Sequence, residues 1–492
     1  RESILEYPAC PRKKIGNCDK VEILSIARQG RMGYDKQRLK WDETLGEECA
    51  AEMGISAHIK AFGFSKVLDY LERDPDANLP RLMEWVDRFT GEKLPQHYRE
   101  LFRSAMSDPE NNWYRLIKSM YTDIDSRVLK KLFENFVLNG NLLDWPQKNA
   151  EGGWPEGGAP WSVLIDPTFP CDMGCKGCGS AIYGVRPVME FDSLDEEIDA
   201  RKAGGTYLYI FPGGDPLSRE QEIIALCNKH SGCVFAAFTP PESITGELAE
   251  DMLRVGNLFP AIQADQPTPE TERAMALMRR ARLPFGVACR CTAENAGRVS
   301  EEGFFDQIIA SGAKFCWFFT YMPVGVGAPT DLLADSHQRE YMYKQIRAFR
   351  DTKPIFTLDF WNDGEYVRGC IAGGRRYLHI NANGDIEPCA FIHYSDSNIR
   401  EKTLLEAYQS PLFMAYHDGQ PFNDNMFQPC PMLENPECLR SMVKKSGAHS
   451  TEYQSPESVD HLCDKTTLYA ETWKPKADEL WAACQGCSGC KK

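Results

Sequence analysis

Six short apolar runs lie in the middle of this 492-residue chain, where they alternate with segments of helical character. The runs span residues 162–165, 206–211, 233–238, 260–263, 285–289 and 314–320. Strands that crossover helices bury on both faces are apolar without interruption, as these runs are. The alternation therefore predicts an α/β domain that is built on a parallel sheet.

The first 150 residues show helical patterning instead. The strongest example is a stretch whose apolar residues share one helical face, namely Val128, Leu129, Leu132, Phe133, Phe136 and Val137. We favour packing of this face against the α/β domain over a second interpretation, an entry path for a lipid-like substrate. A Gly/Pro-rich stretch at 151–160 then predicts a domain boundary.

A β-hairpin is predicted in the last third of the chain. Tyr377–Ile380 and residues 386–389 have strand character, and Asn383-Gly384 between them favours a tight turn. We therefore expect a helical domain over 1–150, an α/β domain over 151–345 and a cysteine-rich domain over 346–492.

Charge and composition exclude several classes of protein. The formal net charge of −15 repels polyanions, and we find no basic patch that would bind nucleic acid. The longest apolar runs fall well short of the roughly 20 residues of a membrane-spanning helix, so we expect no integral membrane segment. The 19 cysteines are odd in number and no signal-peptide pattern is evident, which favours a cytoplasmic protein with metal or cluster sites over a secreted disulfide framework.

A CxxxCxxC motif directly follows the first predicted strand and consists of Cys171, Cys175 and Cys178. Three thiolates on one loop can hold three irons of a 4Fe–4S cluster and leave the fourth iron open to a small molecule. The alternative, a zinc site, would need a fourth nearby Cys or His, which this loop lacks. We therefore favour a cluster with one open position.

A second motif, Gly213-Gly214-Asp215-Pro216, follows the second predicted strand. A glycine pair lets the main chain approach a ligand closely, and a carboxylate can pair with an ammonium group. Taken alone, the motif is equally typical of a strand-to-helix turn.

Together and in this order, the two motifs resemble those of the radical S-adenosylmethionine (radical SAM) superfamily. The resemblance implies a partial (β/α)6 TIM-like barrel in which Gly213, Gly214, Asp215 and Pro216 receive the amino group of SAM. Asp215 replaces the usual Glu, and Gly177 replaces the usual aromatic residue before the last cysteine. By the same resemblance, later strand ends offer further SAM contacts: Gln263 or Asp265, Arg290, and Tyr321 with Gly325. An ion pair at the surface is the alternative for Arg290.

The region from Cys370 to Cys389 resembles the beginning of a SPASM domain, which holds auxiliary iron–sulfur clusters in radical SAM proteins. Its further candidate ligands are Cys430, Cys438 and Cys463. The resemblance implies at least one auxiliary 4Fe–4S cluster. A CxxCxxC run at Cys484, Cys487 and Cys490 offers another metal or cluster site, with a disordered tail as the equal alternative.

The resemblance also implies an activity. SAM would be cleaved reductively to a 5′-deoxyadenosyl radical that abstracts a hydrogen atom, with electrons from a small donor such as flavodoxin or ferredoxin. The substrate would be a peptide or protein side chain, with a small or lipid-like molecule as the alternative. A non-catalytic iron–sulfur electron carrier is a third possibility. Tyr321, Asp359 and His393 are candidates for proton or electron handling, and a structural role is the alternative for each.

Overall fold

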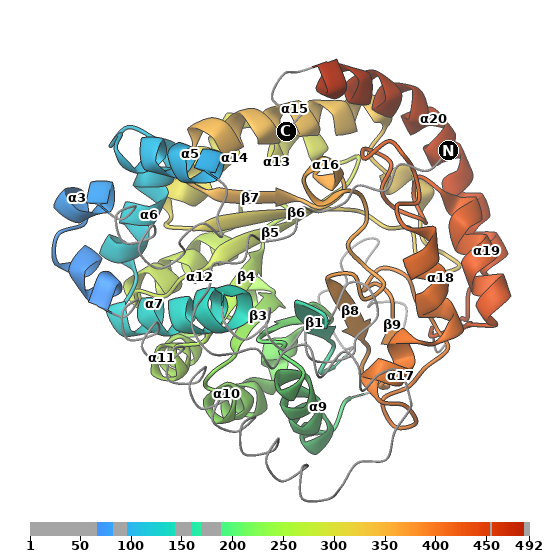
Figure 1. Cartoon of the computed structure of the whole chain (residues 1–492), viewed down its shortest axis with the longest axis horizontal. Helices are drawn as coiled ribbons and strands as arrows, with labels where there is room; N and C mark the ends of the chain where they lie inside the picture. Colours follow the sequence, from blue (N-terminus) through green and yellow to red (C-terminus); the bar gives the residue numbers. More distant parts are fainter. Residues whose placement is uncertain (1–65, 82–95, 143–158, 169–187, 453–454, 487–492) are drawn as a thin grey trace, which may run out of the picture. The chain divides into compact units, whose positions relative to one another are not determined.

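The computed structural model describes residues 66–81, 96–142, 159–168, 188–452 and 455–486. A single curved sheet organises this part of the chain (Figure 1). Its parallel strands β1 to β6 are Ser162–Ile165, Leu208–Phe211, Val234–Thr239, Leu258–Gln263, Gly286–Cys291 and Phe315–Thr320. They lie side by side in chain order, and the six predicted strands are confirmed with ends that differ by at most two residues. The parallel, partial-barrel fold class is thereby confirmed.

Three further strands extend the sheet at its two edges. β7 (Phe356–Asp359) pairs in parallel with β6, and β8 (Tyr377–Ile380) pairs in parallel with β1. β9 (Ile386–Glu387) then pairs antiparallel with β8, which confirms the predicted hairpin. An open partial barrel leaves the backbone of its first strand unpaired on one side, and the hairpin satisfies that edge.

Helices cover the outer face of the sheet, as Figure 1 shows. They are α9 (Phe191–Ala203), α10 (Glu220–Lys229), α11 (Gly246–Val255), α12 (Pro269–Arg280), α14 (Glu302–Ala310) and α15 (Ser336–Thr352). Outward-facing strand residues such as Phe211, Phe235 and Phe318 are fully buried beneath these helices. Short helices lie in the connections: η6 (Pro216–Arg219), η7 (Pro241–Ser243), α13 (Ala296–Val299), η8 (Thr330–Leu332) and α16 (Gly364–Val367).

Further helices precede the sheet in the chain, and the later ones contact the barrel. They are α3 (Pro75–Asn78), η2 (Leu79–Arg81), α5 (Gln96–Met106), α6 (Asn112–Asp123), α7 (Ser126–Leu132) and the π-helix η4 (Phe133–Leu142) that continues α7. Val128 and Leu129 belong to the main core, and the Asn135 amide donates to the Cys233 carbonyl over 2.9 Å. The favoured interpretation of this apolar face, packing against the α/β domain, is therefore confirmed.

Residues after β9 form a second core beside the sheet. Its elements are β10 (Tyr394–Ser395), α17 (Leu404–Tyr408), α18 (Pro411–Gly419), α19 (Pro436–Ser446), β11 (His449–Ser450) and α20 (Val459–Gly486). Trp473 from α20, Tyr416 from α18 and Phe427 are among its fully buried side chains. No helix in the described ranges combines the length and apolar character that a bilayer crossing requires.

Candidate functional site

The cysteine loop with Cys171, Cys175 and Cys178 falls outside the described residues, but both of its ends are described. Thr168 and Val188 form a β-bridge, and the Met189 N–H donates to the Pro167 carbonyl over 3.1 Å. Arg219 of η6 donates to both the Pro167 and Met189 carbonyls, over 2.7 and 2.6 Å. Arg219 therefore clamps the two ends of the loop together.

Sequence reasoning did not single out Arg219. It lies three residues after Pro216 of the glycine motif. That proximity was the available signal, since an arginine on the turn beside the cysteine loop is placed to bind its backbone.

Asp215 caps η6 and joins two strand ends. Its Oδ1 accepts from the Leu217 N–H at 3.2 Å and from the Thr239 hydroxyl at 3.3 Å. Its Oδ2 accepts from the Ser243 hydroxyl at 2.6 Å. Both oxygens of this carboxylate therefore already have protein donors.

Asp166 follows β1 and packs directly on Gly213. A Cβ built on Gly213 would lie 2.0 Å from Asp166 Oδ1, so only glycine leaves room for this carboxylate. Asp166 is 3 % exposed, and its Oδ1 accepts no hydrogen bond from the described residues. Gly213 thus brings the glycine motif into contact with a second aspartate that sequence reasoning missed.

A buried imidazole connects Asp166 to the hairpin. His379 of β8 places Nε2 2.9 Å from Asp166 Oδ2 and Nδ1 2.6 Å from Glu387 Oε2. The Nε2 contact is an ion pair and not an aligned hydrogen bond. Burial alone would lower the pKa of His379, but the Asp166 and Glu387 carboxylates outweigh it and raise that pKa to about 10. His379 is therefore an imidazolium between two carboxylates.

Glu387 has further partners on its second oxygen. Oε1 accepts from the Asn381 amide at 3.1 Å, and His393 Nδ1 lies 3.7 Å away. Burial would raise the pKa of Glu387, but His393 and His379 together lower it to about 2. The catalytic candidate His393 thus belongs to the outer end of the same network.

The remaining strand-end candidates separate into two faces of the sheet. Gln263 ends β4, and Arg290 of β5 pairs with Asp265 across 3.1 Å. Tyr321 follows β6 with a fully buried hydroxyl that has no hydrogen-bond partner in the described structure, and burial raises its pKa to about 12. Asp359 instead aligns with Phe318, on the helix-covered face of the sheet.

Three of the candidate auxiliary ligands converge beside β8. The Gly373 N–H donates to the Pro388 carbonyl over 2.8 Å, which folds the Cys370 loop onto the residue before Cys389. The Tyr377 hydroxyl lies 3.1 Å from Cys389 Sγ. Burial raises the pKa of Tyr377, and the thiols of Cys389, Cys370 and Cys430 add to that rise. All three thiols therefore lie near one tyrosine.

These thiols sit among hydrogen-bond donors. Cys370 Sγ accepts from the Ala372 N–H at 3.4 Å, and Cys430 Sγ accepts from the Met432 N–H at 3.4 Å. Burial raises the pKa of Cys370 to about 12 and that of Cys389 to about 11, so iron must displace protons when it binds. N–H donors to sulfur are typical of cluster ligands, whose charge they stabilise.

A buried hydroxyl completes this auxiliary site. Tyr416 is fully buried, and its hydroxyl has no hydrogen-bond partner in the described structure. Burial raises the pKa of Tyr416, and the nearby Cys389, Cys370 and Cys430 thiols add to that rise. A cluster sulfur would give this hydroxyl an acceptor. The thiols are spaced too widely for one zinc ion, whose ligand atoms lie about 4 Å apart. Within the described ranges, the one group of three potential metal ligands whose atoms all lie within 4.8 Å of one another is Asp195, Asp199 and His230.

The other cysteine candidates have oxygen partners or lie apart. Cys463 donates to the Pro436 carbonyl at 3.1 Å, and Cys484 donates to Glu365 Oε2 at 2.8 Å. Cys438 lies half-buried in the first turn of α19. Cys487 and Cys490 lie outside the described residues.

Residues 370–438 match the family model of the SPASM iron–sulfur cluster-binding domain. The chain is also similar to an AdoMet-dependent heme synthase of Nitratidesulfovibrio vulgaris, with 24 % identity over 52 % of this chain and 80 % of that protein. The chain is a radical SAM enzyme with a SPASM domain. A second heme synthase, from Oleidesulfovibrio alaskensis, is 22 % identical over 52 % of this chain and 76 % of that protein.

Among solved structures, the radical SAM enzyme resembles Streptococcus suis SuiB bound to its precursor peptide SuiA. The two share 15 % identity and a TM-score of 0.48 over 70 % of this chain and 91 % of SuiB.

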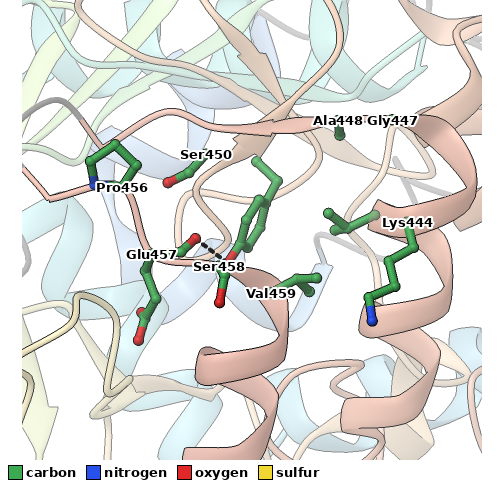
Figure 2. A pocket seen from close by; sticks show the side chains of 10 residues that line it. Lys444, Gly447, Ala448, Ser450, Pro456, Glu457, Ser458 and Val459 are labelled. Atoms are coloured by element: carbon green, nitrogen blue, oxygen red, sulfur yellow. Dashed lines mark hydrogen bonds between the residues drawn. The ribbon is translucent and has the colours of Figure 1, made fainter.

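A surface pocket of about 430 Å³ lies between α19, α20 and β11 of the radical SAM enzyme (Figure 2). Its lining includes Tyr394, Lys444 and Glu457. Lys444 pairs with Asp460 over 2.7 Å, and Glu457 pairs with Lys465 over 2.6 Å. Both charged groups of the lining are therefore already neutralised. Gly325, a predicted SAM contact, donates its N–H to the same Glu457 at 2.8 Å.

Proposed function

We propose that this radical SAM enzyme cleaves SAM reductively and uses the resulting radical to abstract a hydrogen atom from an apolar part of its substrate. The proposal is carried by the three thiols of Cys370, Cys389 and Cys430, which lie near Tyr377 on the strand that extends the barrel. An auxiliary cluster held there would stand at the edge of the same sheet whose strand ends carry the glycine motif. When bound, the catalytic cluster and SAM supply a 5′-deoxyadenosyl radical.

Several residues prepare the catalytic end of the sheet. Cys171, Cys175 and Cys178 are the proposed ligands of the catalytic cluster, and Arg219 holds the ends of their loop. The main chain of Gly213 and Gly214 offers a close approach to SAM. Tyr321, whose buried hydroxyl has no hydrogen-bond partner among the described residues, lies near Arg290 and offers a further polar contact.

Aromatic side chains from β3, β4 and β6 lie on the inner face of the sheet. We call Phe238, Phe259, Phe315, Trp317 and Phe319 the aromatic inner face. Phe238 lies 5.5 Å from Trp317 and 5.2 Å from Phe319, and Phe315 lies 4.7 Å from Trp317 between ring centroids. A lining of this kind excludes water, which protects a carbon radical from side reactions. It also favours an apolar or aromatic group at the reacting position.

The aromatic inner face continues toward the auxiliary site. Phe319 stacks on Phe360 at 4.9 Å and contacts Phe391 at 6.1 Å, and Phe391 follows Cys389 by two residues. The substrate space that we propose is therefore bounded by the glycine motif at one end and by the auxiliary site at the other.

Two substrate classes fit this surface. An apolar side chain of a peptide or protein is the first, and a flat apolar small molecule is the second. The two curated relatives are named heme synthases, which supports the small-molecule class. The two classes can be compared by measuring 5′-deoxyadenosine release from SAM after either an apolar peptide or a porphyrin is added to the reduced protein. The class that contains the substrate should stimulate this release. It should also yield a product that has lost hydrogen or carries a new bond.

The activity itself can be tested without a substrate. Anaerobically reconstituted protein, reduced with dithionite, should release 5′-deoxyadenosine from SAM. The Cys171→Ala/Cys175→Ala/Cys178→Ala variant should lose about four irons and all SAM cleavage, because these thiolates supply every protein bond to one cluster. An electron carrier would release no 5′-deoxyadenosine, and unchanged iron content in the variant would contradict the cluster assignment.

A further inference from the structure

Asp166 lies where the glycine motif, the first strand and the SPASM hairpin meet. We propose that Asp166 binds the ammonium group of SAM, and that His379 and Glu387 are positioning residues that hold this carboxylate in place. The inference rests on the proposed function, since it assigns one contact of SAM. It gives Asp166 the ammonium contact that the motif resemblance assigns to Asp215.

The first observation is that the two aspartates differ in their free hydrogen-bonding capacity. Asp215 accepts hydrogen bonds from Leu217, Thr239 and Ser243, with both oxygens used. Asp166 Oδ1 is buried and accepts none from the described residues. A buried carboxylate oxygen without a donor is costly, and a charged donor from a ligand would remove that cost.

The second observation is the contact between Asp166 and Gly213. The carboxylate occupies the space that a side chain would fill at Gly213, only 2.0 Å from the position of a Cβ. The free oxygen therefore faces the segment to which the radical SAM resemblance assigns the SAM amino group.

The third observation concerns charge. His379 lies between two carboxylates, with Nε2 2.9 Å from Asp166 Oδ2 and Nδ1 2.6 Å from Glu387 Oε2. All three side chains are at most 5 % exposed, so water screens electrostatic interactions with the Asp166 carboxylate poorly. SAM brings a cationic ammonium group, which a carboxylate at such a buried position would attract.

The test is the dissociation constant of SAM, measured by equilibrium dialysis of labelled SAM against reconstituted full-length protein without reductant. Asp166→Asn keeps the shape of the side chain but removes its charge, and should weaken SAM binding about tenfold or more. His379→Gln leaves the carboxylate but removes its support, and should weaken binding about threefold to tenfold. Iron content, measured in parallel, reports whether each variant keeps its clusters.

His230→Gln is the matched control. His230 is also a buried histidine paired with a carboxylate, with Nε2 2.8 Å from Asp195 Oδ1, but it lies at the end of α10. Its loss should leave SAM affinity within twofold of the wild type. A larger effect would mean that buried histidine pairs act on SAM binding only through general stability, which would overturn the inference.

A SAM analogue without the amino group identifies the atom that Asp166 binds. Wild type and Asp166→Asn should bind this analogue equally, whereas they should differ for SAM. Equal weakening of SAM and the analogue would overturn the inference, as would unchanged SAM affinity in Asp166→Asn. If wild-type protein binds no SAM, the proposed function itself fails, which is a distinguishable result.

If Asp166→Asn loses its clusters, Gly213→Ala carries the test. The new Cβ would displace the Asp166 carboxylate without removing its charge. SAM affinity should then fall while affinity for the deaminated analogue changes less, and parallel losses for the two ligands would overturn the inference.

Discussion

At the scale of single residues, neighbours decide what a side chain can do. Asp215 and Asp166 stand at adjacent strand ends, yet the Asp215 carboxylate caps η6, whereas one oxygen of Asp166 accepts no hydrogen bond from the part of the chain that the structure describes. Arg219 is an ordinary turn residue by type, but its guanidinium reaches two carbonyls at the ends of the cysteine loop. Contacts of this kind follow from position in the fold and not from residue type.

Arg219→Lys should loosen the cysteine loop. A lysine retains the charge but cannot donate to the Pro167 and Met189 carbonyls in the same forked geometry. Loss of one charged hydrogen bond is worth about 1.5–3 kcal/mol, so we expect a chelator to remove the catalytic cluster about tenfold faster or more. Arg254→Lys, in the exposed pair with Asp251, is the control and should leave the rate of iron loss unchanged.

Asp359→Asn should change how stability depends on pH. Burial, with the nearby charge of Asp363, raises the pKa of Asp359 to about 6. The folded state therefore favours the protonated form of Asp359. The contribution of this carboxyl to the free energy of unfolding is complete below about pH 4 and is lost as the pH rises through about 6. Asparagine mimics the neutral form at every pH. The difference in free energy of unfolding between the variant and the wild type should therefore grow by about 1–2 kcal/mol, in favour of the variant, as the pH rises from 5 to 8.

Urea unfolding at the two pH values measures this gain. Asp108→Asn, at an exposed position, is the control and should show no such difference. A wild-type-like pH dependence in Asp359→Asn would mean that this carboxyl is ionised in the folded state across the range.

At the scale of elements, the β8–β9 hairpin serves two sites. Tyr377 and His379 lie two residues apart on β8, and therefore point to the same side of the sheet. Tyr377 reaches Cys389 at the auxiliary site, while His379 reaches Asp166 at the glycine motif. One short hairpin thus connects the two proposed cofactor sites.

The cysteines of this region should differ in their effect on iron content. Cys370→Ala/Cys389→Ala should remove about four irons, because two of the ligands to one cluster are lost. Cys463→Ala should retain all iron, since the Cys463 thiol donates to the Pro436 carbonyl. Iron and sulfide analysis of protein that is folded by circular dichroism measures both. Full iron content in the double variant would show that these cysteines are structural.

At the scale of the whole molecule, a buried ion pair joins the barrel to the SPASM part. Arg339 of α15 contacts Glu434 at 2.6 Å and the Asn362 amide oxygen at 2.9 Å. The same guanidinium lies over the Trp473 ring of α20 at 4.1 Å. Glu434 Oε2 in turn accepts the Cys430 N–H at 2.7 Å. A barrel helix is thereby linked to a proposed cluster ligand.

Glu434→Gln should destabilise the protein by about 3–5 kcal/mol, because it leaves a buried guanidinium without its counter-charge. Asp464→Asn, which removes an exposed partner of Arg440, should cost no more than about 1 kcal/mol. Urea unfolding of both variants measures the difference. Equal small losses would mean that the Arg339 charge is compensated by its other neighbours.

Local sequence patterns were sufficient for the strands and the hairpin. Continuous apolar runs indicate strands because both faces of a parallel sheet are buried. Asn383-Gly384 indicates a tight turn, and Gly384 indeed adopts a φ of +85° there. The cysteine and glycine motifs likewise sit at strand ends as their positions along the chain indicate. These properties depend on residues that are close together in the sequence.

Only the tertiary structure decided which distant residues meet. Asp166 and His379 are separated by more than two hundred residues, and their contact exists because β8 pairs with β1 across the barrel edge. The same pairing brings Tyr377 to the sheet, and the fold of the loop after Gly369 brings Cys370 to Cys389. Long-range strand pairing depends on which edge is left open once the other strands have formed, and no local pattern in the sequence records that. The sequence by itself therefore determined the strands and the chemical motifs, whereas the tertiary structure decided their partners.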